Sequence, residues 1–258
     1  MNDKFEDLIV KNRDFLKDRI RKSVDFSKTE QNKGIEAPPI QIPYPNDAKL
    51  IDLVVEDKWE EKYTIPLAKA IKNRKSHRNY NGDPLNLDEL SFLLWAAQGL
   101  RYIDGVNGFR NVPSAGCRHS METYLAVFNI IGLEKGIYRY LPLSHQLVLE
   151  FKTDELNQKL INSTFSQQFA GLSAVTFIWT AIPKRMEWRY GPVSHKVIAM
   201  DAGHMGQNLY LACEAINSGT CVIAAYDQDY VDELLNLDGV DEFVIYLAPV
   251  GKINSYEH

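Results

Sequence analysis

Three cations, a histidine and a hydroxyl lie within five consecutive residues, Arg74-Lys75-Ser76-His77-Arg78. Arginine offers a planar fork of donors that matches phosphate oxygens, lysine adds a point charge, and serine adds a short hydroxyl. Because alternate residues of an extended segment point the same way, Arg74, Ser76 and Arg78 could face one ligand. On this stretch alone, an anion-binding site stands beside a simpler interpretation, a solvated basic patch at a helix C-terminus.

A second candidate segment consists of small residues, Pro113-Ser114-Ala115-Gly116. Such residues let a backbone approach a flat ligand closely, although they could equally form a simple turn. A third, Trp188-Arg189-Tyr190, could be the edge of a core or the rim of an active site.

Other common catalytic patterns are missing from the sequence. There is no Ser/His/Asp order, Walker loop, zinc-ligand spacing or GxGxxG run. His204 and Glu214 fall on one expected helix without the HExxH spacing, so no metal site is expected.

Composition restricts the class of protein. The 258 residues suffice for one large domain or two small ones. A net charge of −5 without a long basic run argues against general nucleic-acid binding. No stretch has the apolar length of a membrane span, and the charged N-terminus lacks the apolar region of a secretory signal. Three cysteines without metal or disulfide spacing fit a reducing compartment, so we expect a cytoplasmic protein.

The first part of the chain predicts an arm. Residues 1–22 carry apolar side chains at helical spacing, and residues 37–45 form a proline-rich run that favours polyproline geometry. A helix and an extended segment have little core of their own. We therefore expect residues 1–62 to lie over another surface, a partner subunit, and residues 63–258 to form the domain.

The rest of the chain predicts α+β order around one core. Asn86 could cap a helix with Glu89 at its third position, and Gly99 would end that helix. Further helices are expected at 65–73, 154–163, 201–216 and 231–235. Strands are expected at 124–130, 136–140, 146–151, 174–180, 221–225 and 243–247.

Four motifs in this order resemble those of the nitroreductase-like FMN flavoproteins, and most closely the SagB/ThcOx-type dehydrogenase subgroup. The resemblance covers roughly residues 65–252. The first motif is the R-x-S-x-R run from Arg74 to Arg78, and the second is Pro113 to Gly116 followed by Arg118. The others are Asp201-Ala202-Gly203-His204-x-x-Gln207-Asn208-Leu209, and Asp241-Glu242-Phe243 leading to Pro249-Val250-Gly251-Lys252.

The resemblance implies a mixed, mainly antiparallel sheet flanked by helices, in an FMN-dependent homodimer with sites at the subunit interface. Arg74, Ser76 and Arg78 would hold the phosphate and the pyrimidine edge of the flavin, within a motif that includes Lys75. Gly251-Lys252 would reach the phosphate. Pro113, Ser114, Ala115 and Gly116 of the partner would cover part of the ring, and Ile223, Ala224 and Ala225 would run beside it.

The resemblance also implies electron transfer between NADH or NADPH and a small electrophilic acceptor, such as a nitroaromatic or quinone. One alternative is a SagB-type dehydrogenase that oxidises peptide azolines to azoles. That activity is associated with a Lys-Tyr pair, for which Arg189-Tyr190 is the counterpart, and arginine stays protonated where lysine could act as a base. Arg189 and Tyr190 are therefore only weak catalytic candidates. A second alternative is a non-catalytic flavin-binding protein.

Overall fold

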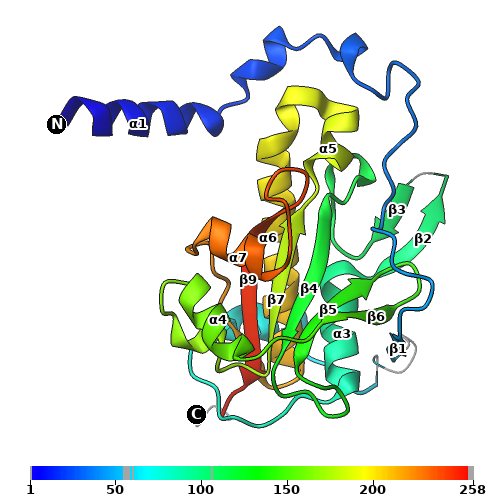
Figure 1. Cartoon of the computed structure of the whole chain (residues 1–258), viewed down its shortest axis with the longest axis vertical. Helices are drawn as coiled ribbons and strands as arrows, with labels where there is room; N and C mark the ends of the chain where they lie inside the picture. The colour runs from blue at the N-terminus through cyan, green and yellow to red at the C-terminus, as the bar shows by residue number, and fades with distance from the viewer. Residues whose placement is uncertain (1, 55–58, 60, 106, 255–258) are drawn as a thin grey trace.

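A computed structural model describes residues 2–54, 59, 61–105 and 107–254 (Figure 1). Its centre is a seven-stranded sheet in the order β1-β6-β5-β4-β7-β9-β8, and every neighbouring pair is antiparallel. Parallel pairing among the described residues is limited to two isolated bridges, Ser76 with Thr220 and Leu85 with Ile130. The strands are β1 Leu50–Asp52, β4 Met121–Val127, β5 Gly136–Leu141, β6 Gln146–Phe151, β7 Val175–Ala181, β8 Ser218–Thr220 and β9 Phe243–Lys252.

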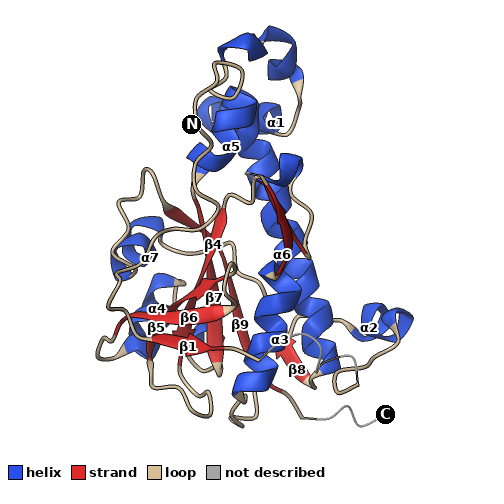
Figure 2. Ribbon diagram, turned by 90° about the vertical axis from the view of Figure 1, so that its right-hand side faces the viewer, coloured by secondary structure: helices blue, strands red, loops and turns tan. Residues whose placement is uncertain are grey.

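Helices cover both faces of this sheet (Figure 2). On β4, Met121 and Leu125 face α3 (Leu87–Gln98) and α6 (Ser194–Ala215), whereas Tyr124 and Ala126 face α4 (Leu156–Ser163) and α7 (Gln228–Leu234). Alternate residues of the strand thus belong to two separate apolar clusters, one on each face of the sheet. Further elements are α2 Leu67–Asn73, α5 Pro183–Tyr190, and the hairpin of β2 Leu100–Asp104 and β3 Asn107–Arg110. The predicted α+β class with a mainly antiparallel sheet is confirmed.

Several local predictions are confirmed in detail. Asn86 and Glu89 form a reciprocal capping box at the start of α3, and Gly99 ends that helix. The hairpin of β5 and β6 and the central strand β7 lie within a residue or two of their predicted positions.

Other predictions are wrong. The strand predicted at 221–225 joins the sheet only through a bridge between Ile223 and Leu247. Side chains, rather than a neighbouring strand, form hydrogen bonds with part of its backbone. Tyr210 Oη accepts the Val222 N–H, and Gln167 donates to the Ala225 carbonyl. The helix predicted at 201–216 begins earlier, at Ser194, and the one predicted at 1–22 ends at Phe15.

The N-terminal part of the chain contains two segments with different surroundings, a projecting helix and an extended segment packed on the domain. Helix α1 (Asn2–Phe15) projects from the body (Figure 1), and its apolar side chains Phe5, Leu8 and Phe15 are exposed. Residues 35–43, which we name the strap, instead lie along their own chain. From the strap, β1 continues into the same sheet. That the N-terminal helix and the strap also lie across a partner subunit stays a prediction.

The strap is bound through its backbone carbonyls. Trp188 Nε1 donates to Ile35 O at 2.8 Å, Arg185 Nε to Pro39 O at 2.7 Å, and Arg110 Nη2 to Ile40 O at 2.9 Å. Arg139 donates to the carbonyls of residues 42 and 43. Prolines lack an N–H, so a proline-rich strap presents mainly acceptors, which match donor-only guanidinium groups.

Candidate functional site

The basic stretch 74–78 runs from the end of α2 to the sheet edge at β8. Arg74 is the C-cap residue of α2, and its Cζ lies 5.2 Å from the centre of the Tyr210 ring on α6. Ser76 Oγ lies 2.9 Å from Tyr210 Oη, and the His77 N–H donates to the Thr220 carbonyl at 2.9 Å. The alternation expected from the sequence thus brings Arg74 and Ser76 to one place.

Arg78 lies apart from that pair. Its Cζ is 5.8 Å from the centre of the Phe169 ring, in the segment between α4 and β7. The side chains of Lys75 and Arg78 are both exposed.

The groups around Arg74 and Ser76 fit a phosphate. A guanidinium and a hydroxyl are suitable donors, and Lys75 lies between them in the sequence. The hydroxyl of Thr220, the backbone partner of Ser76, is buried and lacks a hydrogen-bond partner within the described part of the chain. The negative charge of Glu214 would oppose phosphate binding here. Burial raises the pKa of Glu214 above its ordinary value, and the charges of Arg74 and Lys75 offset part of that rise.

Lys252 is held at the start of α3 instead. Its ammonium group donates to the carboxylate of Glu89 and to the Ile216 carbonyl, the latter at 2.7 Å. Its predicted contact with a phosphate stays a prediction. Beside it, a Cβ on Gly251 would lie 2.6 Å from the Tyr80 ring, so this glycine permits the segment after Arg78 to pack closely on β9.

The segment from Pro113 to His119 forms a strained turn. Gly116, Cys117 and His119 have positive φ angles of 58°, 55° and 42°. Ser114 Oγ donates to Asp201 Oδ2 at 2.5 Å and accepts the His119 N–H at 3.0 Å. Burial raises the pKa of Asp201, whereas hydrogen bonds from Ser114 and the Ala115 N–H lower it. Strain in non-glycine residues is found preferentially at functional sites.

The same turn contacts the end of α5. A Cβ on Gly116 would lie 2.7 Å from Tyr190 Oη and 2.8 Å from Arg189 Cδ. The structure therefore joins two segments that the sequence left separate, the small-residue run and the pair Arg189-Tyr190.

Segment Ile223–Ala225 lies between two side chains that sequence reasoning missed. Tyr210 binds both Ser76 and the Val222 N–H, and Gln167 Nε2 donates to Ala225 O at 3.0 Å. Tyr210 thereby links the basic stretch to this segment. Its signal in the sequence was weak, since it stands just beyond the motif that ends at Leu209.

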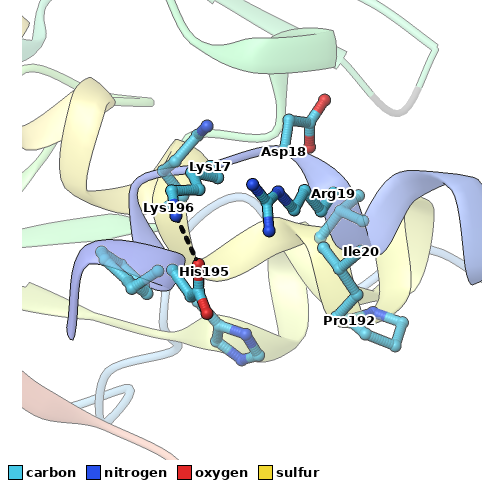
Figure 3. A pocket seen from close by; sticks show the side chains of 10 residues that line it. Lys17, Asp18, Arg19, Ile20, Pro192, His195 and Lys196 are labelled. Atoms are coloured by element: carbon cyan, nitrogen blue, oxygen red, sulfur yellow. Dashed lines mark hydrogen bonds and ion pairs between the residues drawn. The ribbon is translucent and has the colours of Figure 1, made fainter. Parts of the chain in front are cut away.

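No metal site or membrane span emerges from the described residues. They contain no group of three or more His, Cys, Asp and Glu side chains placed to hold a metal ion. None of their helices combines the length and apolar character that crossing a bilayer requires. A cavity of about 540 Å³ between the end of α1 and the start of α6 contains none of the motif residues (Figure 3).

The sequence comparisons agree on one family. Residues 71–252 match the model of the nitroreductase family. A nitroreductase-named protein of Methanocaldococcus jannaschii is 32% identical over 188 residues, which cover 73% of this chain and 91% of that protein. The trifolitoxin-processing protein TfxB of Rhizobium leguminosarum bv. trifolii is 29% identical over 60% of this chain and 44% of its own length.

Solved structures give the same fold. A crystal structure from Ralstonia eutropha, described as that of a nitroreductase, has a TM-score of 0.66 and 27% identity. The match covers 86% of this chain and 100% of that one. One from Anabaena variabilis has a TM-score of 0.66 and 28% identity, covering 83% of this chain and 45% of that one. A chain of the Escherichia coli microcin synthetase McbBCD complex has a TM-score of 0.62 at 21% identity over 90% of this chain and 83% of its own, a likeness in fold alone.

Proposed function

The chain belongs to the nitroreductase family of oxidoreductases, and on that premise we propose that it is an FMN-dependent enzyme. It transfers electrons between NADH or NADPH and a small electrophilic acceptor, such as a nitroaromatic or quinone. The observation that carries the proposal is the cluster of Arg74 and Ser76 at Tyr210, beside the Thr220 hydroxyl, which has no hydrogen-bond partner among the described residues.

Three of the four motifs have a part in this proposal. Arg74 and Ser76 bind the phosphate of FMN, with Lys75 and Lys252 adding positive charge. Arg78 lies at the pyrimidine edge, where a fixed cation favours the reduced state electrostatically. The backbone of Ile223–Ala225 borders the ring. FMN supplies the hydride chemistry when bound, so no protein nucleophile is needed.

The proposed enzyme is a homodimer in which the turn Pro113–Gly116 of one copy covers part of the other copy's flavin. Exposed apolar side chains next to the basic stretch support this arrangement. Leu67 and Ile71 of α2 are 66% and 57% exposed. A patch of this kind on a single chain is typical of a protein interface.

Purification without added flavin tests the proposal. We expect yellow protein that releases FMN rather than FAD on denaturation. Anaerobic mixing with NADH or NADPH should then bleach the flavin absorbance, and adding a quinone should restore it. Colourless protein that fails to bind added FMN would contradict the proposal.

A second candidate is oxidation of azolines in a peptide. The similarity to the trifolitoxin-processing protein favours it, as does the contact of Arg189 and Tyr190 with the proposed active-site turn. For this activity, an azoline peptide rather than a nicotinamide should reduce the bound flavin. If neither reduces it, the third alternative, a non-catalytic flavin-binding protein, is favoured.

A further inference from the structure

Among the described residues, two arginines next to the turn Pro113–His119, Arg118 and Arg189, have no acidic partner. Within the described residues, Arg185 pairs with Glu122 and Arg139 pairs with Glu150. None of the ion pairs found there includes Arg118 or Arg189. A buried charge without a counter-charge is costly, so this arrangement requires a reason.

Arg118 is the buried member of the pair and is 0% exposed. Its Nε donates to Arg185 O at 3.2 Å, and its Nη1 donates to Asn107 Oδ1 at 3.4 Å. Its Cζ lies 4.7 Å from the centre of the Trp188 ring, while Nη2 has no hydrogen-bond partner among the described residues. Burial lowers the pKa of Arg118, and the nearby charges of Arg189 and Arg185 lower it further.

His119 lies beside the same arginines. Its pKa is lowered to about 2, first by burial and then by Arg110, with smaller contributions from Arg118 and Arg185. It is therefore neutral at physiological pH and adds no charge of its own. Burial is the main cause of this shift, and the three guanidinium groups act in the same direction, as positive charges near an imidazole should.

The acidic side chains nearby are engaged elsewhere. Glu122 accepts from Arg185 and from the Ile42 N–H. Glu187, on the same helix as Arg189, lies 2.9 Å from the His195 ring nitrogen. Asp201 accepts from Ser114 and from the Ala115 N–H, with His204 Nδ1 4.0 Å away. None of these contacts neutralises Arg118 or Arg189.

Arg189 and Tyr190 form the accessible part of this positive region. Both are partly exposed, both contact Gly116, and the Arg189 Cζ lies 5.6 Å from the centre of the Tyr190 ring. A partly exposed guanidinium backed by a buried one suits an anionic oxygen, to which the phenol can also donate.

We infer that Arg189, with Arg118 behind it and Tyr190 beside it, binds an anionic group of a reactant. This inference rests on the proposed function, because it places the group at the turn that covers the flavin. Two sources share the chemistry, a carboxylate on the acceptor or a phosphate of the nicotinamide dinucleotide. The ligand would supply the negative charge that the described protein groups do not.

Binding of benzoate and benzamide tests the site without relying on turnover. The two ligands have the same ring, and only benzoate is charged. By calorimetry on the protein as purified, we expect benzoate to bind at least about tenfold more tightly, as charge-assisted hydrogen bonds predict. Arg189→Gln should abolish the preference and Arg189→Lys should keep most of it. The control is Arg21→Gln, which removes an exposed arginine of the N-terminal arm.

Stopped-flow measurements on the holoenzyme identify the source. For an acceptor carboxylate, Arg189→Gln should weaken the binding of 4-nitrobenzoate to the reduced enzyme at least about tenfold more than it weakens 4-nitrobenzamide or slows flavin reduction. If the anionic group is a phosphate of the nicotinamide dinucleotide, Arg189→Gln should instead weaken the binding of NADH or NADPH that precedes flavin reduction. Equal binding of benzoate and benzamide to the wild type would overturn the inference, as would an unchanged preference in Arg189→Gln. Failure of the proposed function alone would show as absent flavin reduction with the benzoate preference intact.

Discussion

At the scale of single residues, the site depends on where charges lie and what each one faces. Arg74 lies against Tyr210, whereas Arg78, four residues later in the same segment, lies against Phe169. The two arginines of one short motif therefore have different surroundings. Their substitution should have different consequences for the proposed enzyme.

Arg78→Gln should alter the redox potential more than flavin binding. Losing a cation near the site of developing charge removes about 1–3 kcal/mol of charge-assisted interaction. For a two-electron couple, about 1.4 kcal/mol corresponds to roughly 30 mV, so the midpoint potential should fall by tens of millivolts. Arg74→Gln should instead lower FMN affinity with little change in potential. Redox titration of both variants checks this, and an unchanged potential in Arg78→Gln would remove the role given to that residue.

His119 should limit stability in acid. Its folded pKa of about 2 lies below the ordinary value of 6.5, so the unfolded chain binds the proton first. The stabilisation is complete above about pH 6.5 and falls as pH decreases toward the folded pKa, by about 2 kcal/mol between pH 6.5 and 5. His119→Asn, whose side chain tolerates the positive φ, should flatten this part of the curve.

Urea unfolding at pH 7, 6 and 5 measures the difference between wild type and variant. His195→Gln, which removes a largely exposed histidine, serves as control and should follow the wild type. If His119→Asn follows the wild type as well, His119 is not the group responsible.

At the scale of elements, the sequence predicted what depends on neighbours along the chain. The capping box of α3 lies within four residues, and the β5–β6 hairpin joins adjacent segments, so local patterns sufficed. The β1–β6 pairing joins residues nearly a hundred positions apart, and no local signal marks it. Helix α5 was missed because it is dominated by polar residues, and its buried Arg185 is stabilised by the strap and Glu122 rather than by apolar packing.

The candidate site divides in the same way. The motif residues were found because they resemble a known family. The alternation predicted for Arg74, Ser76 and Arg78 brings the first two to Tyr210, whereas Arg78 lies at Phe169. Tyr210 and Gln167 could not be found, because each acts through contacts between segments distant in sequence.

Truncations should separate α1 from the strap. Deleting residues 1–24 removes an exposed helix and should change the melting temperature little. Deleting residues 1–45 also removes the carbonyls that bind Arg110, Arg139 and Arg185, three arginines that are at most 4% exposed. Breaking a buried charged interaction costs about 3–5 kcal/mol, so the melting temperature should fall by roughly 10 °C. Differential scanning calorimetry checks this, and equal effects of the two deletions would contradict the role of the strap.

At the scale of the whole molecule, the two ends of the sheet are stabilised differently. The end near α5 combines buried arginines with strap carbonyls. Near the basic stretch, α2, α3 and α6 border a cavity of about 350 Å³ lined largely by apolar side chains, Ile65, Leu67, Trp95 and Leu211 among them. The proposed dimer would cover this second region.

Ile71→Glu should disrupt the dimer and release FMN together. Residue 71 is 57% exposed in the single chain, so the substitution is compatible with a folded protomer, but it places a charge in the proposed interface. Ile131→Glu, at a site 60% exposed between β4 and β5, is the matched control. Sedimentation at micromolar concentration should give a dimer for wild type and control and a monomer for Ile71→Glu. A dimeric Ile71→Glu protein with full flavin would place the interface elsewhere.

The strap also affects how freely this region of the sequence can change. Its bonds to Trp188, Arg185, Arg110 and Arg139 are made by main-chain oxygens, which every amino acid possesses. Side-chain identity along the strap therefore matters less than an extended, proline-favoured backbone. A library of strap sequences that keeps the prolines should retain most folded members. Substitutions along the strap should therefore be tolerated better than substitutions of the arginines that bind its carbonyl groups.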